Sequence, residues 1–96
     1  MRNRYLVAYD ISDDKRWRKV YRCMNGYGDP VQYSVFLCDL SERERVLMVG
    51  SLLSLINQRE DRVMIVNLGP ASGRGEKAIE FLGRSWPMPD RGPVVV

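Results

Sequence analysis

The chain has 96 residues, of which 45% are hydrophobic and 28% are charged, and its formal net charge at pH 7 is +3. This length supports one hydrophobic core, so we expect a single domain over residues 1–96 whose binding site lies on one small surface or is shared between subunits. The apolar runs are much shorter than the ~20 residues that cross a bilayer, which excludes a membrane-spanning protein and indicates a cytoplasmic location.

The first element is predicted to be a buried strand that ends at a carboxylate. Residues 5–9 (YLVAY) are apolar, too few for a stable helix and rich in strand-forming side chains. Asp10 then stands at the carboxyl end of this strand. Ser12, Asp13 and Asp14 can accept hydrogen bonds from free backbone N–H groups, so a helix is predicted to begin near Asp13 or Asp14.

This helix is predicted to pack through one face and to carry cations on the other. Its apolar residues recur at spacings of three and four: Trp17, Val20, Met24 and Tyr27. The basic residues that fall largely on the other side are Lys15, Arg18, Lys19 and Arg22. Gly26 and Gly28 are expected to end the helix through a left-handed cap, and Pro30 prevents its resumption.

The rest of the chain is predicted to hold extended segments around a second helix. Residues 31–40 (VQYSVFLCDL) form either one bent strand or two short ones. Ser41 and Glu44 make a capping box that opens a helix to about Asn57. The predicted core stripe of that helix is Val46, Val49, Leu53 and Ile56. A strand over 62–68, a flexible loop over 71–75, a short element over 76–82 and a Pro-rich tail over 84–96 complete the chain.

This order of elements predicts an α+β fold. The expected architecture is a ferredoxin-like α/β sandwich of the βαββαβ type, with two helices on one face of an antiparallel sheet. The other face of so small a sheet stays open unless a second copy of the chain covers it. We therefore expect a two-fold homodimer.

The residue types limit the chemistry of any site. The chain contains no histidine, which removes the usual general base near neutral pH and the commonest nitrogen ligand of transition metals. Cys23 and Cys38 lie in separate elements without metal-ligand spacing, so two buried thiols are expected rather than a disulfide or a zinc site. Any catalysis must use carboxylates, hydroxyls, cations or a bound hard metal ion.

Asp10 is the first candidate site residue, because it is held on a rigid strand and still reaches the surface. It either binds a metal ion, with a second carboxylate supplied across a two-fold axis, or caps the turn into the first helix. Asp13 and Asp14 have the same two alternatives. The cations beside Asp10 either contact phosphates or form a solvated helix face, and they are Lys15, Arg16, Arg18, Lys19 and Arg22.

The next extended segment carries hydroxyl and aromatic candidates. Ser34 and Phe36 share one face by alternation, so they offer a hydroxyl to a phosphate and a ring to a base, or they pack within the sheet. Tyr9 and Tyr33 have similarly divided interpretations. The glycine-rich loop around Arg74 matches no phosphate-binding spacing and is interpreted as a flexible connection.

Two motifs in this order closely resemble the small CRISPR-associated Cas2 family. They are YDISDD (residues 9–14), followed by a basic helix, and GYGDPVQYSVFLCDL (residues 26–40). The resemblance extends through the second helix and the strand that ends at Leu68. It implies a ferredoxin-like homodimer that works with the CRISPR-associated integrase subunit in acquiring new spacers for antiviral defence.

The resemblance also implies site residues and an activity. Members of the family are described as magnesium-dependent endonucleases on single-stranded RNA or double-stranded DNA. Asp10 falls on the family's metal-binding aspartate, and Tyr9, Ser34, Phe36 and the basic positions near Arg16 to Lys19 fall on its supporting residues. The C-terminal valines resemble a tail strand that such proteins add to a partner subunit's sheet.

Three functions remain as hypotheses from the sequence. The first is a metal-dependent phosphodiesterase, in which paired Asp10 carboxylates hold Mg²⁺ at the dimer axis and cations anchor the flanking phosphates. The second is an adaptor dimer without chemistry of its own, whose basic faces hold duplex DNA for the integrase. The third is a ligand-sensing module in which Asp10 is only a cap.

Overall fold

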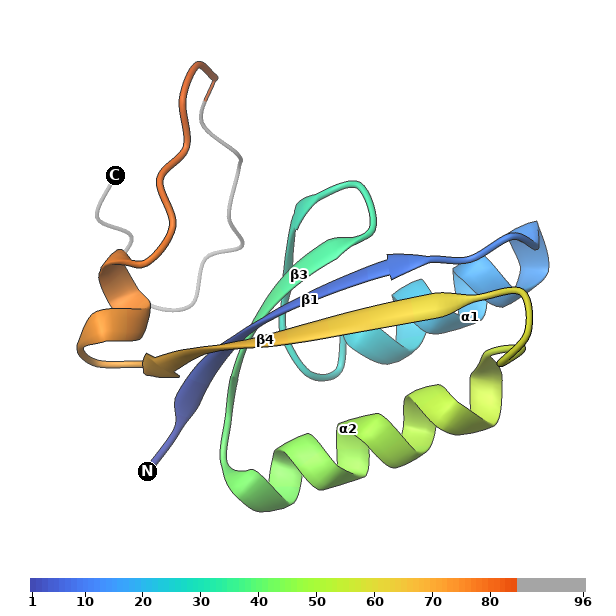
Figure 1. The fold of residues 1–96 in the computed structure, drawn as a ribbon, viewed down its shortest axis with the longest axis horizontal. Coiled ribbons are helices and arrows are strands. Elements are labelled where there is room, and N and C mark those ends of the chain that lie inside the picture. Colours follow the sequence, from blue (N-terminus) through green and yellow to red (C-terminus); the bar gives the residue numbers. More distant parts are fainter. Residues whose placement is uncertain (85–96) are drawn as a thin grey trace.

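The computed structural model describes residues 1–84, with the element order β1 (Asn3–Asp10), α1 (Asp14–Met24), β2 (Asp29–Gln32), β3 (Val35–Leu40), α2 (Glu42–Leu55), β4 (Arg62–Pro70) and the 3-10 helix η1 (Arg74–Lys77). The four strands form one antiparallel sheet in the order β2-β3-β1-β4. Both helices pack on the same face of this sheet (Figure 1). The predicted ferredoxin-like α+β sandwich is therefore confirmed. Residues 85–96, and with them the predicted tail strand, lie outside the described residues.

The core lies between the two helices and one face of the sheet. The buried residues of the two central strands are Tyr5, Val7, Tyr9, Phe36, Cys38 and Leu40. They alternate along β1 and β3, and the register places Val7 opposite Phe36. The helices contribute Val20, Met24, Met48 and Leu52. Because β1 is central and packed along its length, its carboxyl end is a rigid support for Asp10.

Helix α1 begins where the sequence predicts. Its N-cap is Asp13, whose carboxylate accepts a hydrogen bond from the backbone N–H of Arg16 at 2.9 Å. The capping alternative is thus confirmed for Asp13. Asp14 lies in the first helical turn, where its charge complements the positive end of the helix dipole.

The predicted left-handed glycine cap at the end of α1 is wrong. The C-cap residue Asn25 has a helical φ of −60°, and neither Gly26 nor Gly28 has a positive φ. Gly28 is required for another reason, since a Cβ at this position would overlap the Leu37 carbonyl oxygen and lie 2.5 Å from Cys38 Sγ. The glycine lets the segment after α1 approach β3 closely.

Residues 31–40 form two strands rather than one bent strand. Ser34 lies in the turn between β2 and β3 and has φ 60°, a left-handed conformation that is uncommon for residues other than glycine. Ser34 therefore does not share a strand face with Phe36, and that prediction is wrong. The Ser34 carbonyl accepts a hydrogen bond from the backbone N–H of Tyr9 at 3.0 Å, which fastens the turn to the end of β1.

Helix α2 has the predicted capping box but a different core stripe. Ser41 and Glu44 exchange the two expected hydrogen bonds, at 2.8 and 3.2 Å, and the helix ends at Leu55 rather than at Asn57. The buried residues are Met48 and Leu52, whereas two residues of the predicted stripe, Val46 and Leu53, are 55% and 50% exposed. Since apolar residues occur on several faces of α2, periodicity alone could not select the face that packs.

The sheet face opposite the helices, here called the open sheet face, is apolar at its middle and only partly covered within residues 1–84. Its half-buried residues are Leu6, Ala8, Val35 and Leu37, and its exposed residues are Met64 and Val66. Asp10 and Arg62 are register partners at one end of β1 and β4, on this same face. Among residues 1–84, no helix is both long and apolar enough to cross a membrane.

Candidate active site

Asp10 is presented at the rim of the open sheet face. It is the last residue of β1, its side chain is exposed, and it lies opposite Arg62 of β4. A hollow of about 240 Å³ is lined by Ala8, Tyr9, Asp10, Arg62 and Met64. Within residues 1–84, the Asp10 carboxylate accepts no hydrogen bond and forms no ion pair. The capping alternative for Asp10 thus has no supporting contact, because the helix cap is Asp13.

Four of the five predicted cations lie along the outer side of α1. Lys15, Arg18, Lys19 and Arg22 are exposed, and none of them is ion-paired with another residue of 1–84. Spaced over two turns of one helix, they give its solvent face a continuous positive charge. This arrangement permits contact with a phosphate backbone, since no carboxylate of the described chain neutralises it.

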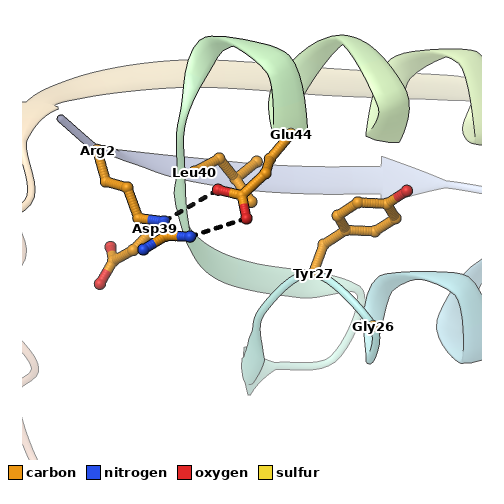
Figure 2. Close-up of a pocket in the computed structure, with 6 residues that line it drawn as sticks. All are labelled: Arg2, Gly26, Tyr27, Asp39, Leu40 and Glu44. Carbon is orange, nitrogen blue, oxygen red and sulfur yellow. Dashed lines mark hydrogen bonds and ion pairs between the residues drawn. The ribbon is translucent and has the colours of Figure 1, made fainter.

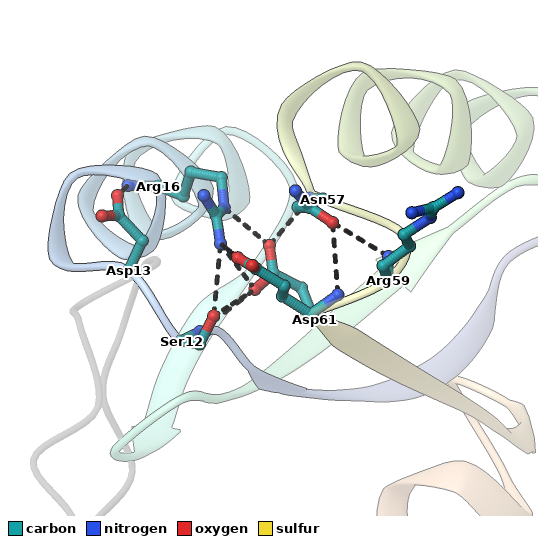
Figure 3. Close-up of polar contacts among 7 residues, drawn as sticks. Ser12, Asp13, Arg16, Asn57, Arg59 and Asp61 are labelled. Carbon is teal, nitrogen blue, oxygen red and sulfur yellow. Dashed lines mark hydrogen bonds and ion pairs between the residues drawn. The ribbon is translucent and has the colours of Figure 1, made fainter.

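The fifth predicted cation, Arg16, has a different environment. Its guanidinium donates to Asp61 Oδ2 at 2.8 Å and Oδ1 at 3.2 Å, to Glu60 Oε1 at 2.9 Å and to Ser12 Oγ at 3.2 Å (Figure 3). Only 25% of the Arg16 side chain is exposed, and none of the Asp61 side chain is. Because its donors are directed at two carboxylates of the same chain, Arg16 is held in a structural ion pair and turned away from the outer face of α1.

Asp61 is the centre of a polar junction, formed by Ser12, Arg16, Asn57, Glu60 and Asp61 (Figure 3). Besides Arg16, it accepts hydrogen bonds from the backbone N–H groups of Ser12 at 3.0 Å and Asn57 at 2.8 Å. The hydrogen bond from Arg16 is the largest cause that holds the pKa of Asp61 well below its usual range, and the two backbone bonds act in the same direction against burial. The junction joins the loop after Asp10 to the loop before β4.

Tyr9 and Phe36 are core residues. Phe36 is completely buried, with its ring centroid 6.2 Å from that of Tyr9 and 5.5 Å from that of Tyr21. The structure therefore supports packing, rather than contact with a base, for Phe36. Burial is the main cause that raises the pKa of Tyr9, followed by the nearby phenols of Tyr21 and Tyr33. Tyr9 Oη has no hydrogen-bond partner among the described residues.

Ser34 is close to Tyr9 but is already engaged. Its hydroxyl accepts a hydrogen bond from Trp17 Nε1 at 2.8 Å, and its carbonyl bonds to Tyr9 as described above. The structure thus brings Asp10, Tyr9 and Ser34 together at one end of the sheet. Two neighbours that sequence reasoning did not assign to the site are Arg62 and Trp17. The only sequence signal for Arg62 was its place at the start of the strand predicted over 62–68.

A second hollow, of about 510 Å³, lies near the amino end of β1 and is lined by Arg2, Gly26, Tyr27, Asp39, Leu40 and Glu44 (Figure 2). Its carboxylates have cationic partners. Arg2 donates twice to Glu44 at 2.9 Å, and Arg4 donates to Asp39 at 2.8 and 3.0 Å. The hydrogen bond from Arg2 is the main cause that lowers the pKa of Glu44 to about 2. These satisfied ion pairs leave no free catalytic group in this hollow.

The donor set for a metal ion is small. Residues 1–84 contain no group of three or more cysteine, aspartate or glutamate side chains placed to hold a metal, and neither Cys23 nor Cys38 forms a disulfide there. The exposed Asp10 carboxylate nevertheless suits Mg²⁺, which takes one or two carboxylates and completes its shell with water and phosphate oxygens. One chain supplies one such ligand, and a second copy could supply the other.

The fold and this site define a small ferredoxin-like protein that presents an unpaired carboxylate beside a cationic helix. The family model described as "CRISPR associated protein Cas2" matches residues 2–73. A relative named CRISPR-associated endoribonuclease Cas2 1, from Rhodospirillum rubrum, is 44% identical over 92 residues, which cover 96% of this chain and 89% of the relative. The chain therefore belongs to the CRISPR-associated Cas2 family.

Other relatives and solved structures agree with this assignment. A protein named CRISPR-associated endoribonuclease Cas2, from Geobacter sulfurreducens, is 34% identical over 96 residues and is covered completely, as is this chain. The crystal structure of Streptococcus pyogenes Cas2 has a TM-score of 0.73 and 30% identity, with coverage of 83% of this chain and 99% of that one. A hypothetical protein from Thermus thermophilus has a TM-score of 0.76 and 32% identity, with coverage of 93% and 100%.

Proposed function

We propose that this chain is a metal-dependent endonuclease that hydrolyses phosphodiester bonds of single-stranded RNA or double-stranded DNA in CRISPR spacer acquisition and antiviral defence. The observation that supports it most is the exposed Asp10 carboxylate, which has no partner within residues 1–84 and stands on a packed central strand. A carboxylate that stabilised the fold would have such a partner, as Asp61 has. The relatives' name, endoribonuclease, points to the same chemistry.

Asp10 would hold the cofactor, Mg²⁺. When bound, the ion supplies a more acidic water and neutralises charge that develops on the phosphate oxygens. The chain's own contribution is positional. β1 fixes Asp10, and the polar junction at Asp61 fixes the loop that follows it. Tyr9 and Phe36 act by packing beneath Asp10, and Ser34 by holding the adjacent turn.

The basic residues would hold the nucleic acid. Lys15, Arg18, Lys19 and Arg22 are free to neutralise phosphates along the outer face of α1. Arg62 stands opposite Asp10 and is also exposed, so it can contact the phosphate next to the scissile bond. Arg16 contributes by fixing the Asp61 junction rather than by contacting the substrate.

A homodimer would complete the site. The middle of the open sheet face is apolar, with Met64 51% exposed and Val66 38% exposed, and a second copy would bury it. Since Asp10 lies at the rim of this face, a two-fold axis near that rim would bring two Asp10 carboxylates together. The resemblance to the family also suggests the CRISPR integrase subunit as a partner.

A second candidate is a non-catalytic adaptor dimer that holds duplex DNA for the integrase. The observation that favours it is the unpaired cationic face of α1. Its four exposed cations extend over two helical turns, which is more surface than is required to position one phosphate at Asp10. This function requires Arg18 and Lys19 but not Asp10. It predicts that Asp10→Asn binds duplex DNA as tightly as the parent chain.

The test is cleavage of labelled single-stranded RNA and duplex DNA by the parent and by Asp10→Asn, with Mg²⁺ and with chelator. We expect cutting that needs Mg²⁺ and falls by roughly 100-fold or more in the variant, because a metal's contribution to transition-state stabilisation is several kcal/mol. Asp14→Asn removes the same charge from a nearby exposed position and should cut at the parental rate. Equal cutting by Asp10→Asn and the parent would refute a nuclease centred on Asp10, and absence of cutting by both proteins with retained duplex binding would favour the adaptor.

A further inference from the structure

We propose that Trp17, Tyr21 and Tyr33 form a stacking platform that binds one unpaired nucleobase of a single-stranded nucleic acid. The three rings are nearly parallel. The Trp17 and Tyr21 centroids are 5.2 Å apart at 16°, and those of Trp17 and Tyr33 are 5.1 Å apart at 13°. This inference names the substrate class of the nuclease proposed above and rests on that function where it assigns the strand to be cut.

Tyr33 is the exposed member of the platform. It remains 78% exposed even though its ring stacks with Trp17. A stacked neighbour covers one face of an aromatic ring, so the second face of Tyr33 is open to solvent. A flat, open aromatic face is the surface on which single-stranded nucleic acids place their bases, and any base can use it because every base has a π-face.

The platform is held rigidly. Trp17 Nε1 donates a hydrogen bond to Ser34 Oγ at 2.8 Å, which fixes the indole against the β2–β3 turn. The Ser34 carbonyl in turn accepts from the backbone N–H of Tyr9, the residue before Asp10. A ring fixed before binding loses little conformational freedom when a base stacks on it. The same contacts link the platform to Tyr9, the residue before the candidate metal ligand.

The surroundings of the rings suit a nucleotide. A hollow of about 310 Å³ is lined by Trp17, Tyr21, Pro30, Gln32, Tyr33 and Ser34. Gln32 is exposed and offers an amide donor and acceptor for the edge of a base. Arg18 and Arg22 follow Trp17 and Tyr21 on α1, so exposed cations flank the aromatic surface where phosphates would run. This positive charge favours a nucleic acid over an uncharged apolar peptide as the occupant.

The platform would distinguish single strands from duplexes. A base inside a duplex is stacked on both faces and can reach Tyr33 only after it is flipped out, which costs unstacking and unpairing energy. A base in a single strand is available without that cost. Tyr33 should therefore contribute to affinity for single-stranded RNA and contribute nothing to affinity for duplex.

Binding without cleavage tests the platform separately from the nuclease. Fluorescence anisotropy with chelator present would compare the full chain with Tyr33→Leu, which removes the ring, and Tyr33→Phe, which keeps it. The probes are a labelled oligouridylate, the same strand with abasic positions, and an RNA duplex of equal length. We expect Tyr33→Leu to weaken oligouridylate binding by roughly 10-fold, while Tyr33→Phe stays within about twofold of the parent.

The abasic strand gives the decisive comparison. Tyr33→Leu and the parent should bind it equally, because no base remains to stack, and both should bind the duplex equally. Equal affinity of Tyr33→Leu and the parent for oligouridylate would overturn the platform, as would the same loss on the duplex or on the abasic strand. Loss of cleavage in Asp10→Asn tests only the proposed nuclease, so either claim can fail while the other stands.

Discussion

Two polar regions at the same end of the molecule have opposite characters. The Asp61 junction buries a carboxylate completely and satisfies it with an arginine and two backbone N–H groups. The rim of the open sheet face, a few residues away along the chain, exposes Asp10 and Arg62 without an ion pair between them or to any other residue of 1–84. The first region stabilises the fold, and the second has charges available for a ligand.

Residue type and sequence proximity therefore do not show which cations are free to bind a ligand. Arg16 and Arg18 are two positions apart on α1, and both belong to the basic cluster after Asp10. A helix turns by about 100° per residue, so the two side chains point in different directions. Arg16 faces the α2–β4 loop and its carboxylates, whereas Arg18 faces solvent.

The largest effect on stability is expected at Asp61. Asp61→Asn removes the charge that pairs with Arg16 and leaves buried donors with a weaker acceptor. We expect its thermal midpoint to fall by roughly 10 °C. Asp10→Asn, the matched change at the rim, should leave the midpoint unchanged or raise it slightly. Thermal unfolding followed by circular dichroism measures both, and equal midpoints would contradict the division into structural and functional carboxylates.

Low pH should also weaken the junction, because protonation of Asp61 removes the charge that pairs with Arg16. The folded-state pKa of Asp61 lies below its unfolded value, so its stabilising effect is fully present above the unfolded pKa of about 3.9 and is lost as the pH falls through the folded pKa. Urea unfolding from pH 6 downwards should show parental stability falling below pH ~4. Asp61→Asn should fall less steeply there, and identical pH slopes for the two proteins would show that the pairing is not the cause.

Arg18 and Arg16 should differ in their effect on the salt dependence of nucleic-acid binding. Neutralising Arg18 and Lys19 together should weaken duplex binding and reduce the slope of log K against log salt by about 2, since each phosphate contact contributes ~0.9. Arg16→Gln should leave that slope unchanged, once affinities are corrected for the fraction of folded protein. A salt slope that falls as much in Arg16→Gln would place Arg16 on the nucleic acid and overturn its structural role.

The smallest effect is expected at Phe36. Phe36→Leu keeps an apolar side chain in the core, so it should cost about 1 kcal/mol of unfolding free energy. RNA cleavage per folded molecule should remain within about twofold of the parent, because a fully buried ring acts by packing. A large loss of cleavage with little loss of stability would show that the ring reaches the substrate.

The sequence predicts most of the fold because several local signals agree. The apolar run of β1, the cap at Asp13 and the capping box at Ser41 each specify one element, and the order of the elements specifies the βαββαβ arrangement. The packing face of α2 was mispredicted because the helix is apolar on more than one side. The end of α1 was mispredicted because Gly28 is required for close packing against β3 rather than for a left-handed cap. No local sequence pattern reveals such a tertiary contact.

The site was predictable only in part. The exposed position of Asp10 on a rigid strand follows from its place directly after a buried segment. The engagement of Arg16 depends on Asp61, which is 45 residues away along the chain. The position of Arg62 opposite Asp10 in the sheet depends on the strand order. The stacking of Trp17 with Tyr33 depends on the β2–β3 turn at Ser34. Each of these contacts joins elements distant in sequence, so residue spacing alone carries no signal for them.

The most direct test of the central claim is single-turnover cleavage of single-stranded RNA by Asp10→Asn and Asp61→Asn under Mg²⁺, expressed per folded molecule. If Asp10 at the rim is required for catalysis and the Asp61 junction for stability, the cleavage rate of Asp61→Asn should be within about tenfold of the parent's. The cleavage rate of Asp10→Asn should fall by roughly 100-fold or more. Parental cutting by a fully folded Asp10→Asn would contradict the account.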